Sequence, residues 1–415
     1  YKASIVNILK GDNDQWFRPS DVCVAPDGSL MVADWYDPGV GGHAVGDLNR
    51  GRIYRVAPKK AKYLVKQLSV NTASEAVEAL KSPNMSQRYH AWIKLNEMGL
   101  DAEEALLTLR KSSNPIYQAR ALWLLSMLEG KGQDYIEQAL TDDNPDIRIT
   151  GIRAARNLGK NINPLLKTLI NDPSAQVRRE IAVALRNDTS SEAEDLWVEL
   201  ATQYTGDDRW YLEALGIGAT NKSERLYQKW LSKVGDQWNS KAGRDIIWRL
   251  RDDQVLGKLS DLIINSSEDW TDKLRYFRAF DFHTPDKSNA ELLKLIKQQN
   301  ANKDQITLTA LFHFSEDFIA NNREIKGLLK SVLKTYRGTP EYFSLVSKLK
   351  LESEYQQVLQ LAMDSASNQI GTLACKLLLD LGQKELIASK MNDSNSSLFI
   401  ELLGKVNTGS GYDIL

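Results

Sequence analysis

Cysteine and histidine, which most often form covalent cross-links or hold transition metals, are scarce: the 415-residue chain has two cysteines and four histidines. Cys23 and Cys375 lie far apart, in segments of different character, which excludes a disulfide framework and argues against a single disulfide. The histidines share no metal-ligand spacing with each other or with the cysteines. We therefore expect no metal site in this chain.

Several familiar functional signals are also absent. The sequence has no glycine-rich phosphate-binding motif, no G-x-S-x-G nucleophile motif and no C-x-x-C-H haem-attachment motif. No apolar run approaches the ~20 residues needed to span a bilayer. Lysine and arginine (53) almost balance aspartate and glutamate (54), and the net charge of −1 disfavours non-specific binding to nucleic acid or anionic membranes. We expect neither a nucleic-acid partner nor a membrane span.

Residues 1–60 are rich in short β-type segments. Strands are predicted at Ser4–Leu9, Asp21–Ala25, Ser29–Tyr36 and Gly51–Val56, with a tight Pro-Asp-Gly turn between the second and the third. About four such strands cannot bury both faces of a sheet, so this region should belong to a larger β domain or lean on the segment C-terminal to it. Its outer strand should expose an edge unless the helices cover it.

From residue 73 the hydrophobic period becomes helical and one pattern recurs. Four segments have a proline, then an arginine, then apolar or small residues at helical spacing, and three more keep the pattern without proline. The steps between the seven arginines are 32, 28, 30, 31, 35 and 31 residues. The arginines are Arg88, Arg120, Arg148, Arg178, Arg209, Arg244 and Arg275.

This recurrence predicts a mainly α fold, a HEAT-like α-α superhelix (solenoid) preceded by the small antiparallel β segment. We expect a linker at 61–72, compact HEAT-like repeats over 73–300 and irregular helical repeats over 301–415. The clearest repeat signatures are the segments NPDIR and DPSAQVR.

The arginines admit two interpretations, a ligand-binding stripe or structural residues of the repeat. We favour the structural one, because a repeat needs the same residue in each unit for packing alone. A guanidinium can bond loop carbonyls or an acidic side chain of the adjacent repeat through its fixed fork. Core packing is likewise favoured over a stacking platform for the tryptophans of the repeat helices, and Cys375 is interpreted as a small core residue. These tryptophans are Trp92, Trp123, Trp210, Trp248 and Trp270.

The stretch ADWYDPGVGGHAVGD, from Ala33 to Asp47, is unlike the rest of the chain. The carboxylates of Asp34, Asp37 and Asp47 could bind a hard cation such as calcium, and His43 could act as a base. Aspartate, proline and glycine are equally what a long surface turn between two strands requires. Both interpretations stay open on composition alone.

Two parts of the sequence resemble one known family. FRPSDVCVAPDGSLMVADWYDPGVGGHAVGD followed by GRIYRVAP resembles the last blade of a six-bladed propeller of the glucose/sorbosone-dehydrogenase type. RALWLLSML, DDRWYLEAL and RDIIWRLR resemble the HEAT-like repeats that come after this propeller in large bacterial secreted proteins of the membrane-bound dehydrogenase type. The resemblance implies a partial blade at 1–60, with Ser4–Leu9 as the outer strand of the preceding blade. Since the chain begins at Tyr1 with strand-like residues, we expect a piece of a longer bacterial protein, periplasmic or secreted.

The resemblance also bears on chemistry. It implies that Asp34, Tyr36, Asp37 and His43 approach the propeller cavity in the intact parent protein. Parents of this type are expected to use pyrroloquinoline quinone and calcium and to pass electrons to a c-type haem domain. Because this chain lacks most of the cavity and the haem motif, we expect no cofactor in it and no catalysis by it.

The expected function is therefore a non-catalytic helical-repeat scaffold in a large extracytoplasmic multidomain protein. Its expected partner is a protein or neighbouring domain, such as the propeller or a cytochrome c domain, and through the parent a carbohydrate. The alternative is part of a quinone-dependent sugar or alcohol dehydrogenase whose haem domain lies outside this chain. A nucleic-acid-binding repeat needs a basic stripe that the net charge does not predict, and the propeller-like segment argues against a cytosolic transport scaffold.

Overall fold

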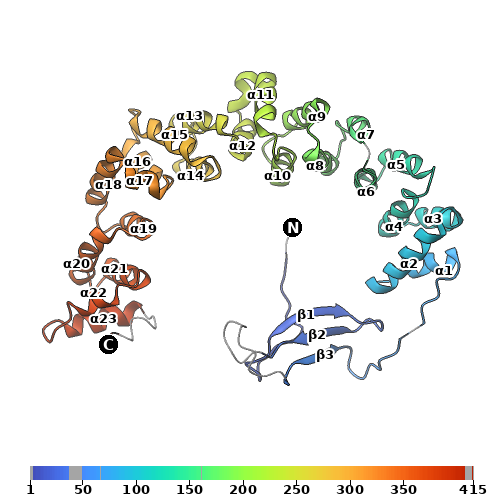
Figure 1. Ribbon diagram of the computed structural model, residues 1–415, viewed down its shortest axis with the longest axis horizontal. Helices are drawn as coiled ribbons and strands as arrows, with labels where there is room; N and C mark the ends of the chain where they lie inside the picture. The colour runs from blue at the N-terminus through green and yellow to red at the C-terminus, as the bar shows by residue number, and fades with distance from the viewer. Residues whose placement is uncertain (1–2, 37–48, 66, 160, 407–413, 415) are drawn as a thin grey trace. The chain divides into compact units, whose positions relative to one another are not determined.

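The computed structural model describes residues 3–36, 49–65, 67–159, 161–406 and 414. It is mainly α-helical, with one small β-sheet near the N-terminus (Figure 1). The chain divides into two compact units, residues 1–187 and 188–415.

The sheet of unit 1 has three antiparallel strands in the order β1 (Pro19–Val24), β2 (Leu30–Asp34) and β3 (Arg52–Val56). β1 and β2 are joined by the predicted tight turn, in which Ala25 N donates to the carbonyl of Ser29 over 2.8 Å. Gly28 adopts a φ of 85° there, which only glycine takes without strain. Three of the four predicted strands are therefore confirmed.

The fourth predicted strand is wrong. Ser4–Leu9 forms no ladder with another strand, and its apolar side chains are exposed, with Ile5 at 94% of its full accessibility. β-branched composition alone does not make a strand, because the backbone also needs a partner for its hydrogen bonds.

Within the described residues, both faces of the sheet expose an apolar side chain. Side chains alternate between faces along a strand, and Val22 shares a row with Val32 and Tyr54, while Ile53 belongs to the opposite face. Val22 is 58% exposed and Ile53 is 76% exposed. Both β1 and β3 are edge strands of the described sheet, as the sequence predicts for its outer strand.

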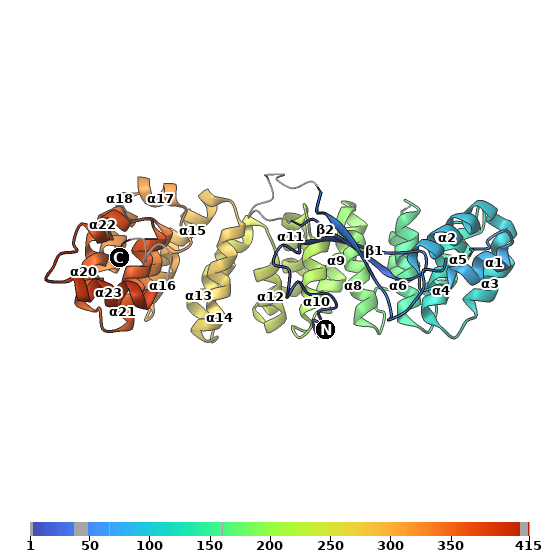
Figure 2. The same ribbon diagram turned by 90° about the horizontal axis from the view of Figure 1, so that it is seen from below.

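The remainder of unit 1 consists of helices that pack in antiparallel pairs, α1 with α2, α3 with α4 and α5 with α6. They are α1 (Ala73–Leu80), α2 (Met85–Met98), α3 (Glu103–Arg110), α4 (Pro115–Leu125), α5 (Gly132–Leu140), α6 (Pro145–Asn157), α7 (Asn163–Thr168) and α8 (Ala175–Ala184). Figure 1 shows α4, α6 and α8 in one layer and α3, α5 and α7 in the other, and in Figure 2 α4, α6 and α8 follow one another side by side. Buried leucines and isoleucines such as Leu106 and Ile147 fill the space between the layers.

The even-numbered helices of unit 1 recur every 30 residues, a spacing that we call the 30-residue frame. The N-cap residues of α2, α4, α6 and α8 are Asn84, Asn114, Asn144 and Ser174, each 30 residues after the last. The three asparagine side chains accept hydrogen bonds from backbone N–H groups of the first turn, which have no partner within the helix. Asn84 also donates through Nδ2 to the carbonyl of Ala25 over 3.0 Å, which ties the sheet to the first repeat.

Unit 2 continues the helical pattern with less regular spacing (Figure 1). Its helices are α9 (Ser191–Thr202), α10 (Arg209–Gly218), α11 (Ser223–Val234), α12 (Lys241–Arg249), α13 (Leu256–Asn265), α14 (Trp270–Ala279), α15 (Pro285–Lys297), α16 (Lys303–Leu311), α17 (Glu316–Asn321), α18 (Arg323–Thr335), α19 (Pro340–Lys348), α20 (Tyr355–Asp364), α21 (Gln369–Asp380), α22 (Lys384–Ala388) and α23 (Ser396–Val406). The largest fully buried side chains are aromatic here, including Trp197, Trp230 and Tyr276.

The tryptophans predicted to lie in the core of the repeats are buried only in part. Trp92, Trp123, Trp248 and Trp270 are half-buried, but Trp210 is 59% exposed at the start of α10. The most buried tryptophans lie elsewhere, in α9 and α11. Helical spacing predicts the face of a helix on which a residue lies. It does not predict how far side chains at the ends of the helix are buried by neighbouring helices.

The predictions for the cysteines can also be compared with the structure. Cys375 is 2% exposed on α21, which confirms it as a core residue, and burial raises the pKa of its thiol to about 11. Cys23 is exposed on β1, and both thiols are free.

Candidate functional site

The acidic stretch singled out in the sequence is described only at its start. Asp34 ends β2 and is 3% exposed, whereas Asp37 and His43 lie outside the described residues. The Asp34 carboxylate accepts hydrogen bonds from the backbone N–H groups of Arg18 (2.8 Å) and Tyr36 (3.1 Å) and from Arg52 Nε (2.8 Å).

Electrostatics at Asp34 reflect these donors. Burial acts to raise the pKa of its carboxyl group, but the hydrogen bonds from Arg18 and Arg52 outweigh burial and hold that pKa below its usual value. The group is therefore an ionised carboxylate whose charge is met by protein donors. The Arg52 guanidinium and the two backbone N–H groups thus meet the charge of the buried carboxylate from within the protein.

Tyr36 belongs to the same cluster. Its backbone has a φ of 50°, and the guanidinium of Arg52 lies 4.8 Å from the centre of its ring. Arg52 also forms an ion pair with Asp14 at 2.8 Å. The cluster thus ties the segment before β1 to the end of the sheet. Among the described residues, no group of three or more histidine, cysteine or acidic side chains is arranged to hold a metal ion.

Three of the four repeat arginines of unit 1 bond to backbone carbonyls five or six residues before them. Arg88 Nη1 donates to the carbonyls of Ser82 (3.3 Å) and Pro83 (3.1 Å). Arg148 Nη1 donates to the carbonyl of Asp142 over 2.7 Å, and Arg178 donates to that of Asp172. Each arginine therefore closes the loop that leads into its own helix.

Arg148 makes a second contact. Its Nε and Nη2 atoms donate to the two carboxylate oxygens of Asp172 over 2.7 and 2.8 Å. The arginine side chain is 11% exposed and the aspartate side chain 3% exposed. This is a buried bidentate pair between adjacent repeats.

Arg120 differs from the other arginines of unit 1. Its Nη1 donates to the carbonyl of Leu80, 40 residues earlier, over 2.8 Å. The loop-closing position is taken by Gln118, whose Nε2 donates to the carbonyl of Ser112 over 2.6 Å. Positions 88, 118, 148 and 178 are each 30 residues apart, so the uneven steps of 32 and 28 in the arginine series arise because Arg120 stands two residues away from the repeat position.

The repeat arginines of unit 2 all pair with carboxylates, and Arg244 Nη1 also donates to the carbonyl of Asn239, five residues earlier, over 2.9 Å. Arg209 forms an exposed ion pair with Glu213 at 2.6 Å. Arg244 forms one with Glu268 at 3.1 Å, and Arg275 donates to Asp245 over 2.6 Å. All seven arginines predicted from the repeat thus have partners within the protein.

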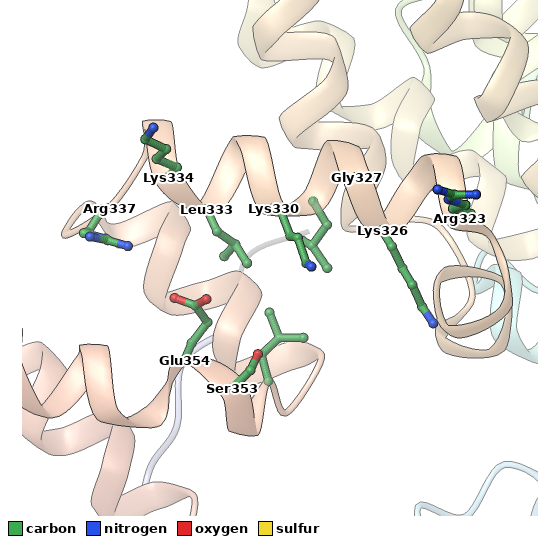
Figure 3. Close-up of a pocket in the computed structure, with 11 residues that line it drawn as sticks. Arg323, Lys326, Gly327, Lys330, Leu333, Lys334, Arg337, Ser353 and Glu354 are labelled. Atoms are coloured by element: carbon green, nitrogen blue, oxygen red, sulfur yellow. The ribbon is translucent and has the colours of Figure 1, made fainter.

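A different group of cations stands out on α18. Arg323, Lys326, Lys330 and Lys334 lie on this helix and Arg337 comes directly after it, all five exposed. They line a cleft of about 680 Å³. Figure 3 shows them along the helix, with Ser353 and Glu354 across the cleft. Within the part of the chain that the structure describes, the side chains of these five cations form no ion pair or hydrogen bond.

The remaining lining does not neutralise this charge. Glu354 is the one carboxylate that lines the cleft, and it accepts a hydrogen bond from the hydroxyl of Tyr342 over 2.9 Å. Burial, with this bond to Glu354, raises the pKa of Tyr342 well above its usual value. Leu329, Leu333 and Leu351 add apolar surface. The cleft is therefore a cationic groove with an apolar floor.

Sequence reasoning missed this groove, because the net charge of the whole chain hides a local excess. The signal is present in the segment REIKGLLKSVLKTYR, where basic residues recur after 3, 4, 4 and 3 positions. This spacing places them on one face of a helix.

Comparison with protein families supports the helical repeats. The model of HEAT repeats matches residues 103–186, which span α3 to α8 and include the loop-closing positions 118, 148 and 178. No curated protein matches the chain. In the described part of the chain, no helix has both the length and the apolar character that crossing a membrane requires.

Proposed function

We propose that the chain is a non-catalytic helical-repeat scaffold within a large extracytoplasmic bacterial protein, periplasmic or secreted. The observation that carries this proposal is the HEAT-repeat region, whose regular positions serve the fold. Stacked helical repeats offer long surfaces that bind other proteins or domains. The expected partner is a neighbouring domain of the same parent, such as a propeller or a cytochrome c domain.

The sheet supports the propeller as that neighbour. Each blade of a propeller packs against blades on both sides, so both of its faces need cover. The sheet has this property, because Val22 on one face and Ile53 on the other are exposed apolar side chains. We therefore interpret residues 17–58 as part of a terminal blade that packs against the rest of a propeller.

The test is a pull-down at physiological salt from cells that make the protein, with identification of what is retained. The wild-type chain should retain a propeller or cytochrome c protein, and Val22→Lys with Ile53→Lys should lose it. Ile116→Lys is the matched control, because Ile116 is also exposed (58%) but lies on α4. Retention of neither class of protein by the wild-type chain would contradict the proposal.

A second candidate is that the parent is a quinone-dependent sugar or alcohol dehydrogenase. Its support is the resemblance of residues 17–58 to the last blade of such a propeller, together with the three-stranded sheet found there. Pyrroloquinoline quinone, calcium and a c-type haem would then be held by other parts of the parent, and a carbohydrate would be the substrate. Absorption spectra of the full-length protein that show neither haem nor quinone would exclude this candidate.

A further inference from the structure

The cations of α18 form a continuous row. Positions 323, 326, 330, 334 and 337 are separated by three or four residues, which is the spacing of one helix face. With a rise of 1.5 Å per residue, the part of the row that lies on α18, from Arg323 to Lys334, is about 17 Å long. All five cations line the cleft, and Figure 3 shows Lys326 and Lys330 on the side of the helix that faces Ser353 and Glu354.

The fold does not account for this row. Like charges three or four residues apart on a helix repel each other, so the row weakens α18 in the absence of a counter-charge. The one acidic residue of the helix, Glu324, pairs with Lys297 at 2.9 Å. Arg148 shows the opposite arrangement, because its charge is met by Asp172 inside the protein. Among the described residues no carboxylate pairs with the row of α18, so its charges are available to an anion from elsewhere.

The lining and shape of the groove distinguish between three anionic ligands: a nucleic acid, a membrane surface and an acidic helix. None of the residues that line it is aromatic, so it offers no platform on which nucleobases stack. The groove is hollowed between α18 and the segment of Leu351 and Glu354, and a flat bilayer would not reach into it. Its apolar floor includes Leu329 and Leu333. An amphipathic helix laid into a groove meets both an apolar floor and a charged rim.

The spacing of the charges points to the same ligand. A helix with acidic residues every three or four positions presents its carboxylates at the spacing of the cations of α18, because both obey the same helical rise. Three of the five cations are lysines, whose ammonium groups act as mobile point charges and suit carboxylates presented at varied angles.

We propose that the α18 groove binds an acidic amphipathic helix of a partner protein. The inference rests on the proposed scaffold role in that the ligand is part of a protein, and it adds the chemistry that the partner must present. Binding should weaken steeply with salt, since it depends on charges at the protein surface.

The probe is a synthetic alanine-based helical peptide of about six turns, with glutamates every three or four positions and leucines beside them. Its control has glutamine in place of each glutamate. A fluorescent label on the peptide gives the dissociation constant for the full chain by anisotropy. Lys326→Glu with Lys330→Glu reverses two charges that line the groove. Lys287→Glu with Lys376→Glu makes the same change in net charge at exposed positions outside the lining of the groove.

The inference predicts that the glutamate peptide binds the wild-type chain and that the glutamine peptide does not. The groove variant should weaken binding by about tenfold or more, while the control variant changes it by less than about twofold. Circular dichroism should show that both variants keep their helices.

Equal binding of the two peptides, or equal loss in the two variants, would overturn the inference. Tighter binding of a single-stranded oligonucleotide or of phosphatidylglycerol vesicles at the same salt would also overturn it. The outcome is separate from that of the proposed function. If the peptide fails while a propeller or cytochrome partner is still retained through the sheet, only this inference falls; if the peptide binds and no such partner is retained, the proposed function falls.

Discussion

In unit 1 the loop-closing positions 88, 118, 148 and 178 are 30 residues apart, whereas in unit 2 Arg209, Arg244 and Arg275 are separated by 35 and 31 residues. The side chains differ as well. Those of unit 1 donate to backbone carbonyls of their own loops. In unit 2 all three arginines pair with carboxylates, and Arg244 alone of the three is also described as donating to the carbonyl of its own loop, at Asn239 over 2.9 Å. With a fixed repeat length, the same backbone-directed bond recurs in each repeat of unit 1, whereas in unit 2, where the length varies, every repeat arginine is also paired with a carboxylate.

The comparison extends to cations that do not serve the fold. Arg148 is buried and its charge is met by the protein, whereas Lys326 and Lys330 of unit 2 are exposed and line a cleft. A cation's position in the repeat therefore does not decide whether it stabilises the fold or is available to a ligand. What decides this is whether a carboxylate or carbonyl of the protein pairs with it.

The largest expected effect comes from breaking the buried pair of unit 1. Arg148→Ala leaves the Asp172 carboxylate buried without its counter-charge, and we expect the free energy of unfolding of unit 1 to fall by about 3–5 kcal/mol. Arg209→Ala is the comparison in unit 2. Its side chain is 63% exposed, so the loss should stay below about 1 kcal/mol. Urea unfolding monitored by circular dichroism measures both, and similar losses would contradict the distinction between the units.

A second prediction concerns pH in unit 2. His283 is buried, with its Nδ1 3.4 Å from Asp253, and burial lowers the pKa of the imidazole despite that carboxylate. Protonation is therefore harder in the folded than in the unfolded state, so the free energy of unfolding should decrease as pH falls below about 6.5. The slope from this residue is at most about 1.4 kcal/mol per pH unit.

His283→Leu should flatten this pH dependence between pH 7 and about 5, where the unfolded histidine takes up its proton. Asp253→Asn should steepen it, because it removes the charge that favours the imidazolium. Urea midpoints measured across this range distinguish the cases. A variant without His283 that keeps the wild-type slope would show that another group is responsible.

The 30-residue frame can be tested where the sequence departs from arginine. Gln118→Ala removes the bond to the carbonyl of Ser112, so unit 1 should lose about 1 kcal/mol of stability. Hydrogen exchange of the amides at 112–118 should speed up more than exchange at 142–148. A change confined to regions outside the 112–118 loop would show that the frame has been assigned wrongly.

The smallest effect is expected on α18 itself. A Cβ added at Gly327 meets open space, so Gly327→Ala should stabilise the helix by about 0.4–1 kcal/mol through the entropy of the unfolded chain. Thermal unfolding measures the gain. Gly371→Ala is the contrasting variant, because its Cβ would meet the backbone of Ser365, and it should destabilise unit 2.

Much of the fold could be predicted from the sequence. The recurrence of proline, a basic residue and apolar positions predicts HEAT-like helices, and residues 103–186 match that family. Three strands are predicted by their composition and the Pro-Asp-Gly turn. Ser4–Leu9 fails because a strand also needs a partner for its backbone, which no local pattern supplies.

The site was harder to predict. Counting arginines placed Arg120 in the repeat series, because the count tracks residue type while the structure depends on the capped loop that Gln118 closes. The sequence predicts Asp34 as a possible cation ligand, but not its donors. Two of these, Arg18 and Arg52, lie 16 and 18 positions away, and the third is the backbone N–H of Tyr36. The groove of α18 is not predicted, because the net charge of −1 is a sum over the whole chain and does not show a local excess of basic residues.

The central claim is that the repeat arginines serve the fold while the cations of α18 serve a ligand. Hydrogen exchange of the full chain, with and without the glutamate peptide, tests it most directly. The account predicts added protection in α18 and around Leu351 and Glu354, with no change in the loops at 82–88, 142–148 and 172–178. Added protection in those loops, with α18 unchanged, would contradict it.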